Sequence, residues 1–280
     1  MSEGKILMKL SARISGSTAL LLVLASTVGC TKLRARDQLV KGVQAFKAGQ
    51  YEVAVNHFQE SINLDPDYDT ARLDLAAAYA FEVVPNLDTP ENIKTAHKAI
   101  DGFNYVLSKN PNDLGALRQI ASIHFNIKQW DQTKVDELKV ISLDPNDAEA
   151  NDMIGVIDFQ RSLLNETAIL SAAGLTDDGM GTPKKSKDVC AKLATANSAL
   201  ITEALKYLQQ AVSINPTYED AMQYLNLVYR RKANIECGDD AARKADLDQA
   251  DMWVQKAMGA RKANEAAKEK KLGGGIDLNK

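Results

Sequence analysis

Four prolines close helical segments of this chain in nearly the same local sequence. Pro66, Pro111, Pro145 and Pro216 end the runs LDP, KNP, LDP and INP. Proline disfavours the helical conformation of the residue before it, so each run marks the end of one helix and the start of a turn. Pro111 and Pro145 lie 34 residues apart, and the other two intervals, 45 and 71 residues, exceed that period by 11 and 37 residues. A helical unit repeated with insertions predicts a solenoid stabilised by contacts between neighbouring units.

The composition agrees with a helical chain. Aromatic residues make up only 6% of the sequence, while alanine and leucine are abundant, which favours helices over sheets. Without residues 1–29 the chain has 31 basic and 36 acidic residues, a net charge of −5. We expect no basic stripe on the remaining chain that could follow a nucleic-acid backbone, so nucleic acid is not an expected partner.

The first repeat has small and aromatic residues at characteristic positions. Gly42 and Ala54 are small where two helices would cross closely, and Phe58 would fill the space between them. Together with Tyr51 at the turn and Pro66 at the end, these residues resemble the tetratricopeptide repeat (TPR), a pair of antiparallel helices. One departure is a serine at residue 61, where the family usually has alanine.

The resemblance extends, less strictly, over residues 35–265. It implies an all-α, right-handed TPR superhelix of about five helix pairs, with a long insertion in the fourth pair and a C-terminal capping helix. We expect this solenoid to occupy residues 35–268, with insertions at about 82–92 and 161–190. Residues 269–280 contain GGG and are expected to form a flexible tail.

Residues 1–29 have the three parts of an export signal. Three basic residues precede an apolar run at 19–28, which is too short for a permanent membrane span of about 20 residues. The following TVGC resembles the lipobox of bacterial lipoproteins, which implies that Cys30 becomes the lipidated first residue of the mature chain, followed by a linker at residues 30–34. A plain secretory signal with an incidental cysteine is the alternative. Since Thr31 rather than aspartate follows the cysteine, the resemblance implies the periplasmic face of the outer membrane.

Cys190 and Cys237 are the other two cysteines, and thiols in an oxidising envelope compartment often pair. Both are expected on the edge where helices turn within a repeat. Their distances from the repeat ends differ by about 10 Å at 1.5 Å per residue. A disulfide requires Cα atoms within about 7 Å, so the sequence leaves the bond open.

The sequence lacks the usual signs of catalytic chemistry. His57, His97 and His124 lie in three different repeats without a second ligand one helical turn away, which favours structural roles. No phosphate-binding glycine motif is present, and no cofactor, metal site or small-molecule substrate is expected.

A partner-binding surface is implied by the TPR resemblance, because the inner face of such a solenoid is lined by the first helix of each pair. The residues assigned to this face are Leu39, Val43, Phe46, Leu73, Arg118, Phe125, Asp152, Phe159, Gln223 and Arg230. An apolar track through the three phenylalanines, with polar residues at its rim, suits an extended or helical segment of another protein. The alternative is that these phenylalanines pack between helices.

These features favour a lipid-anchored scaffold or adaptor that binds protein or peptide partners in an assembly of the cell envelope, such as an outer-membrane, pilus or secretion complex. One alternative is a regulator that docks on a cell-wall enzyme through the insertion at residues 161–190. That insertion is equally compatible with a tolerated surface loop. An enzyme is the remote alternative.

Overall fold

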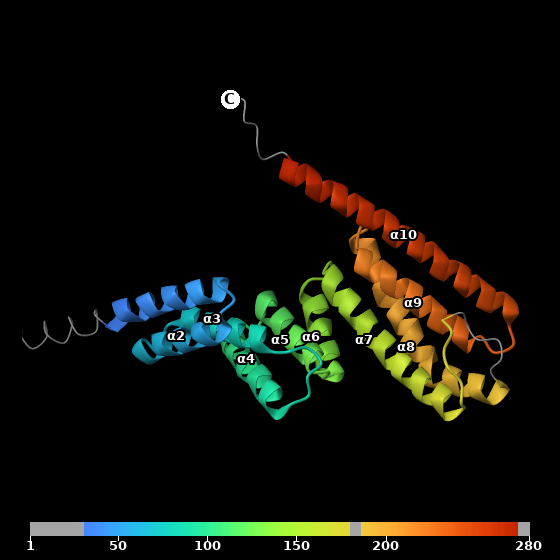
Figure 1. The fold of residues 1–280 in the computed structure, drawn as a ribbon, viewed down its shortest axis with the longest axis horizontal. Coiled ribbons are helices and arrows are strands. Elements are labelled where there is room, and N and C mark those ends of the chain that lie inside the picture. The colour runs from blue at the N-terminus through green and yellow to red at the C-terminus, as the bar shows by residue number, and fades with distance from the viewer. Residues whose placement is uncertain (1–30, 180–185, 274–280) are drawn as a thin grey trace, which may run out of the picture. The chain divides into compact units, whose positions relative to one another are not determined.

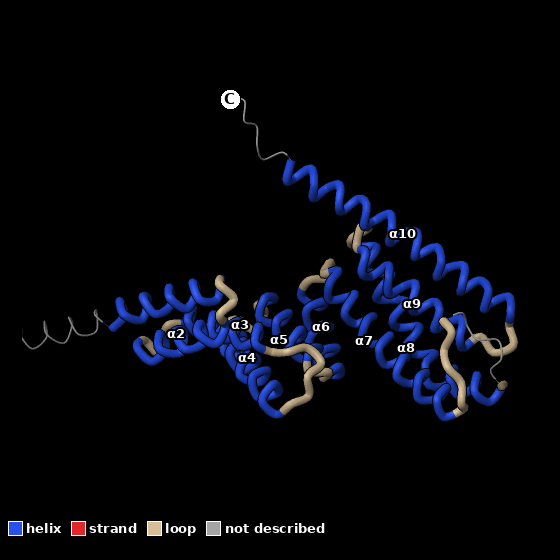
Figure 2. Tube along the Cα trace, viewed as in Figure 1, coloured by secondary structure: helices blue, strands red, loops and turns tan. Residues whose placement is uncertain are grey.

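The computed structural model describes residues 31–179 and 186–273, and helices dominate both ranges. Figure 1 shows a succession of helices, and Figure 2 shows that the described residues contain helices and loops but no strand. The chain divides into two compact units, one up to Lys128 and one from Gln129 onward. Most consecutive helices are joined by short turns, and the longer connections follow Glu82 and Ala172. The described chain is thus all-α and made of successive helix pairs, as the sequence predicts.

The first described helix of the N-terminal unit occupies residues 31–47. It is followed by α2 (Tyr51–Leu64), α3 (Asp69–Glu82), α4 (Pro90–Lys109) and α5 (Leu114–Asn126). The first of its two main apolar clusters centres on Phe58 and the second on Phe103.

The described part of the C-terminal unit contains α6 (Trp130–Leu143), α7 (Ala148–Ala172), α8 (Lys187–Ile214), α9 (Glu219–Ile235) and α10 (Asp240–Gly273). Of these, α7, α8 and α10 are longer than any described helix of the N-terminal unit. Helices α7, α8, α9 and α10 enclose one apolar cluster that includes Leu208, Leu225 and Trp253.

The four prolines end helices as the sequence predicts. Helices α2, α4, α6 and α8 each stop two residues before their proline, and the intervening residue is Asp65, Asn110, Asp144 or Asn215. In each case the backbone N–H of this residue still donates to a carbonyl of the last helical turn. The recurrent DP and NP pairs are therefore helix ends, with a structural role.

Two glycines permit close helix crossings. A Cβ atom built on Gly42 would lie 2.5 Å from the ring of Phe58, which is 1% exposed. In the C-terminal unit, a Cβ atom on Gly155 would lie 2.5 Å from Cγ of the fully buried Leu208 and 3.2 Å from the carbonyl oxygen of Ala204. The function expected for Gly42 and Phe58, close packing of two helices, is confirmed by this geometry.

The substitution Gly155→Ala is expected to lower the free energy of unfolding of the C-terminal unit by about 1–3 kcal/mol, because the added methyl group forces α7 away from α8. Gly259→Ala, in an open part of α10 with no atom within 4 Å of the added Cβ, is the matched control and should stabilise by up to about 1 kcal/mol. Both tryptophans of the chain belong to this unit, so their fluorescence in a urea titration measures its stability. Equal effects of the two substitutions would contradict the crossing described here.

Three expected boundaries differ from the structure. The first helix already includes residues 31–34, where we expected a linker. The insertion expected at 82–92 is a loop of residues 83–89, because Thr89 accepts a hydrogen bond from the Asn92 N–H and α4 begins at Pro90. At the other end, α10 continues to Gly273, beyond the expected limit at residue 268. The sequence KANEAAKEKK has high helix propensity and contains no glycine or proline to stop it.

The long insertion mainly lengthens two helices. Helix α7 has 25 residues and α8 has 28, against 14 in α6. Lys134 of α6 lies 3.2 Å from Asp158 of α7 and 2.8 Å from Glu203 of α8, and Asp131, in the first turn of α6, pairs with Arg161. The outer halves of α7 and α8 therefore extend beyond the start of α6, and α9 packs against them instead.

Candidate functional site

Three aromatic side chains meet at one edge of the N-terminal unit. The ring centroids of Phe46 and Tyr51 are 5.3 Å apart, those of Phe46 and Phe81 5.0 Å, and those of Tyr51 and Phe81 5.2 Å. Phe81 is 59% exposed, although it contacts both other rings. These three residues are called the aromatic cluster below.

The chain brings this cluster together through two helix ends and a turn. Phe46 lies in the last turn of the helix 31–47, and Tyr51 begins α2. Between them Gly49 has φ +73°, a conformation that glycine adopts without a steric penalty. Phe81 lies in the last turn of α3. The helix 31–47 and α3 are the first helices of two successive pairs. Both end at this edge of the unit, so Phe46 and Phe81 come into contact.

Sequence reasoning found Phe46 but missed Phe81 as a surface residue. Leu73, Ala77 and Phe81 follow one another at intervals of four residues and so share one face of α3. The insertion expected from about residue 82 would begin directly after Phe81, but α3 continues to Glu82. Reading the four-residue spacing one step further would have identified it.

The remaining residues assigned to the inner face of the N-terminal unit are distributed between surface and core. Leu39 and Val43 are half-buried and pack with Phe46 against the cluster around Phe58. Leu73 is 41% exposed. On α5, Arg118 and Phe125 are half-buried. The face is therefore apolar next to the aromatic cluster and more polar at α5.

Two residues assigned to a surface in the C-terminal unit are instead buried. Phe159 is 6% exposed and packs edge-on against Tyr224 of α9, with ring centroids 5.6 Å apart. Asp152 is 8% exposed and its Oδ2 accepts a hydrogen bond of 3.3 Å from the hydroxyl of Tyr218. Both predictions of an exposed position were wrong, because α9 packs on α7 along this face. For Phe159 the alternative of packing between helices is the one observed.

Burial changes the acidity of Asp152. Loss of hydration raises the pKa of this carboxyl group from its usual 3.8 to about 7, the Tyr218 hydrogen bond opposes the rise, and Asp220 and Glu149 add to it. A folded-state pKa above the unfolded one stabilises the fold at low pH, and this contribution is lost as the pH rises through about 7. The other side chains that face Asp152 from α9 include Tyr224, whose own pKa burial raises.

Asp152→Asn is expected to stabilise the C-terminal unit by about 2 kcal/mol at pH 8 and to change it little at pH 4. A tenfold change in proton affinity corresponds to about 1.4 kcal/mol, and burial of the new amide offsets part of the gain. Urea titrations followed by tryptophan fluorescence at several pH values measure the effect. Asp220→Asn, at an exposed position, is the control and should show a much smaller change with pH. A stabilisation by Asp152→Asn that is the same at pH 4 and pH 8 would contradict the raised pKa.

Gln223 and Arg230 of α9 occupy different surroundings. Gln223 is exposed and lines a groove of about 280 Å³ between α9 and α10, together with Leu227, Val254 and Met258. Arg230 is half-buried and donates hydrogen bonds of 2.9 Å to Asn226, 3.1 Å to the carbonyl of Gly179 and 2.9 Å to Asp251. Arg230 thus holds a loop and α10 to α9.

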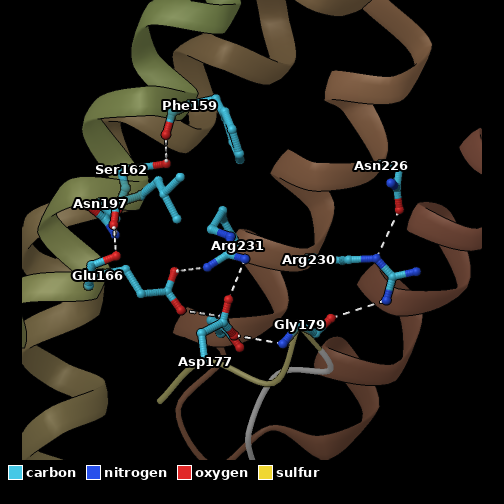
Figure 3. Close-up of polar contacts among 12 residues, drawn as sticks. Phe159, Ser162, Glu166, Asp177, Gly179, Asn197, Asn226, Arg230 and Arg231 are labelled. Carbon is cyan, nitrogen blue, oxygen red and sulfur yellow. Dashed lines mark hydrogen bonds and ion pairs between the residues drawn. The ribbon is translucent and has the colours of Figure 1, made fainter. Parts of the chain in front are cut away.

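A charged cluster in the interior was missed by sequence reasoning. Arg231, 7% exposed, lies between the carboxylates of Glu166 and Asp177, as Figure 3 shows. Its Nη1 is 2.9 Å from Oε2 of Glu166, which is 1% exposed. Asn234 donates to Glu166 and, at 3.1 Å, to Asp177, and the N–H of Gly179 donates to Asp177 at 2.9 Å. Glu166, Asp177, Arg231 and Asn234 are called the buried charged cluster below, although the side chain of Asp177 is 22% exposed at its edge.

The buried charged cluster fastens the segment after α7 to α9. Asp177 lies in the loop that follows α7, and Arg231 and Asn234 lie in the last turns of α9. Burial by itself would raise the pKa of Asp177, but the Gly179 N–H, Arg231 and Asn234 together lower it. Its carboxylate form therefore stabilises the fold above the usual carboxyl pKa, and this stabilisation is lost as the pH falls through the lowered value.

Cys190 and Cys237 form the disulfide that the sequence left open. Their Cα atoms lie 5.7 Å apart. The expected mismatch of about 10 Å is absent, because Cys237 lies in the turn between α9 and α10 rather than in a straight helix, and the turn reaches the first turns of α8. The bond joins α8 to this turn at the same end of the unit as the buried charged cluster.

The described residues contain no group of three or more histidine, cysteine or acidic side chains arranged to hold a metal ion. His57 makes a hydrogen bond of 2.7 Å with Gln38, which gives it a structural role. Among residues 31–179 and 186–273, the helices are all too short or too polar to cross a membrane. Cys30, the expected lipidation site, lies outside the described residues.

Comparisons with known proteins agree with this fold. Residues 44–80 match a family model described as TPR repeat. A MamA RS-1 double mutant is similar in structure (TM-score 0.53, 17% identity), with 83% of this chain and 97% of that chain covered. A crystal structure of MamA protein has a TM-score of 0.52 and 15% identity, covering 83% and 94% of the two chains. For MamA from Desulfovibrio magneticus RS-1, residues 41 to the end, the values are 0.52 and 16%, covering 82% and 96%.

A comparison with curated protein sequences gave no match. The sequence identities to the solved structures are low, so the similarity to them concerns the fold alone. The matched repeat contains Tyr51, Ala54, Phe58 and Pro66, four of the residues on which the resemblance was based. The described chain therefore has the all-α fold of a TPR solenoid, and residues 44–80 form a TPR repeat.

Proposed function

We propose that this protein is a non-catalytic scaffold, anchored by lipid on the periplasmic side of the cell envelope, that binds other proteins of an envelope assembly. The aromatic cluster carries the proposal of protein binding. The export signal and the lipobox-like TVGC support the location. A TPR solenoid supplies helix faces on which a polypeptide can lie.

The aromatic cluster has the properties of a protein-binding surface. Phe81 remains 59% exposed, and two residues of the following loop, Val84 and Leu87, are 51% and 42% exposed. Phe81 and the loop are held in place, because the side-chain amide of Asn92 donates to the carbonyls of Val84 and Leu87 and accepts from the Val84 N–H. A preorganised aromatic surface next to exposed aliphatic residues loses little conformational entropy on binding. The partner segment should present apolar side chains to it.

Phe81→Ser is expected to weaken partner binding by about 30-fold, since a central aromatic residue often contributes 2 kcal/mol or more to an interface. In cells, a photo-reactive phenylalanine analogue at position 81 should give a distinct cross-linked envelope protein, and the yield of this product should fall when Phe46 is also replaced by serine. The same analogue at position 135 of α6 is the control, because Val135 is 67% exposed but remote in sequence from the cluster. Identical products from the two positions, or none from position 81, would contradict the proposal.

The anchor requires a separate measurement. Mass spectrometry of the mature N-terminal peptide should find diacylglycerol and acyl chains on Cys30, and Cys30→Ser should release the protein from the membrane fraction. A mature chain that begins at another residue would overturn the anchor but leave the protein-binding surface untouched.

A second candidate function is a regulator that docks on a cell-wall enzyme. One observation favours it: the outer ends of α7 and α8 enclose a groove of about 430 Å³, lined mostly by small and aliphatic residues such as Ala168, Ile169 and Val189. Ala168→Arg would fill this groove without touching the aromatic cluster. If it abolishes an envelope hydrolase or synthase activity while Phe81→Ser does not, the regulator is favoured over the scaffold.

A further inference from the structure

The helix at residues 31–47 differs in charge from the rest of the mature chain. It contains five basic residues and one acidic residue, whereas residues 48–280 contain 26 basic and 35 acidic residues. All five basic side chains, at positions 32, 34, 36, 41 and 47, are exposed. The net charge of the whole chain is therefore negative, although residues 31–47 carry a local positive charge.

One side of this helix is exposed along its whole length. Leu33, Arg36, Val40, Gln44 and Lys47 are spaced by three or four residues and so form a single row, called the outer row below. Leu33 is 70% exposed and Val40 is 53% exposed. The opposite side buries Ala35, Gly42 and Ala45 against the N-terminal unit. The two aliphatic side chains of the outer row are thus not required by the core of that unit.

Much of the positive charge around the outer row is uncompensated. Asp37, the acidic residue of the helix, pairs with Lys41 at 2.7 Å. Within the part of the chain that the structure describes, Arg36 and Lys47 form no ion pair. A surface that combines exposed aliphatic residues with flanking cations is poorly matched to water or to a phosphate backbone alone. It matches the interface of an anionic lipid bilayer, where both kinds of side chain are stabilised.

We propose that the outer row of the helix 31–47 binds the surface of an anionic membrane. Leu33 and Val40 would enter the headgroup region, while Arg36 and Lys47 would extend their aliphatic stems along the helix and place their charges near lipid phosphates. The helix would lie in the plane of the membrane, and its other face would remain packed on the protein.

This inference rests on the membrane placement in the proposed function and adds a second contact to the lipid anchor. The described part of the helix starts at residue 31, which follows Cys30 in the sequence, so a lipid on that cysteine would hold the outer row at a high local concentration near the bilayer. A basic surface and an acyl anchor strengthen each other in membrane binding. The outer row would also fix the orientation of the solenoid relative to the membrane.

The test uses residues 30–280 with Cys30→Ser, which removes the lipid but retains every contact described for residues 31–273. Circular dichroism checks that the helical fold is kept. The protein is mixed with vesicles of phosphatidylcholine alone or with vesicles that also contain phosphatidylglycerol, and the bound fraction is measured by flotation. We expect binding to the anionic vesicles that decreases with added salt, and little binding to the neutral ones.

Two double substitutions measure separately how much the basic and the aliphatic side chains of the outer row contribute to vesicle binding. Arg36→Gln with Lys47→Gln should weaken binding about fivefold for each charge removed, whereas Lys262→Gln with Lys268→Gln, on the exposed part of α10, should leave it unchanged. Leu33→Ser with Val40→Ser should weaken binding at least about tenfold. Val135→Ser with Leu138→Ser, at similarly exposed positions of α6, is the matched control.

Equal binding to neutral and anionic vesicles, or equal effects of the outer-row and control substitutions, would overturn the inference. If Cys30 carries lipid in cells but the Cys30→Ser chain does not bind anionic vesicles, the inference fails while the proposed anchor stands. If the vesicles bind but no lipid is found on Cys30, the anchor fails while the outer row remains a membrane-binding surface.

Discussion

Replacing Arg231 by methionine is expected to lower the free energy of unfolding of the C-terminal unit by about 3–5 kcal/mol. The guanidinium group lies between two carboxylates, one of which, Glu166, is 1% exposed. Methionine fills a similar volume but leaves Glu166 and Asp177 without a cation, and Glu166 lies where water cannot solvate it. A urea titration followed by tryptophan fluorescence reports this unit, because Trp130 and Trp253 both belong to it.

Two further variants test whether the lower stability of Arg231→Met comes from uncompensated carboxylates or from a loss of packing. Arg230→Met removes the neighbouring arginine, whose ion-pair partner Asp251 is 72% exposed, and should lower stability by only about 1 kcal/mol or less. Adding Glu166→Gln and Asp177→Asn to Arg231→Met removes both stranded charges and should restore much of the lost stability. If Arg231→Met behaves like Arg230→Met, the buried charged cluster does not have the role described here.

The disulfide is expected to stabilise the same unit by about 4 kcal/mol, on the chain-entropy account of a cross-link between residues 47 apart. The bond ties the start of α8 to the turn after α9, so it restricts the unfolded chain over almost the whole of both helices. The double variant Cys190→Ser, Cys237→Ser should unfold at a correspondingly lower urea concentration. A reducing agent should shift the parent protein to the same position.

The control for this measurement is internal to the chain. Cys30→Ser leaves the bond intact and should unfold like the parent, and a reducing agent should not change the double variant. A parent protein whose unfolding is insensitive to a reducing agent that demonstrably reduces the bond would contradict the expected contribution. The buried charged cluster lies at the same end of the unit, so combining the two sets of substitutions would show whether their effects add.

The helix ends and helix crossings could be predicted from the sequence because they depend on local chemistry. Asp65 followed by Pro66 ends α2 through the steric effect of the proline ring, whatever the rest of the chain does. Gly42 and Phe58 lie on two helices that are joined by a single short connection. They occupy fixed positions of a repeated unit, so their contact follows from the repeat itself. The TPR resemblance assigned Phe46 to the inner face, and the structure places this residue half-buried, in contact with the exposed Phe81.

The boundaries of the insertion and the depth of each side chain depended on contacts that are distant in sequence. Phe159 has the same spacing within its repeat as residues that line a surface, but the long α9 covers it. Arg231 and Glu166 are separated by more than sixty residues, and no local pattern indicates that they pair. The aromatic cluster was only partly predictable, because the contacts of Phe81 with Phe46 and Tyr51 depend on how α3 packs against residues some thirty positions earlier in the chain.

By itself the sequence determined where helices end and which small residues allow them to cross closely, since proline geometry and residue size act over a few residues; the antiparallel pairing followed from the resemblance to the TPR. Only the tertiary structure decided which faces of those helices are covered, which cysteines and charges meet, and which side of the first helix stays exposed. These features arise from the burial of whole helices against one another, and burial is a property of the packed unit and not of any segment within it.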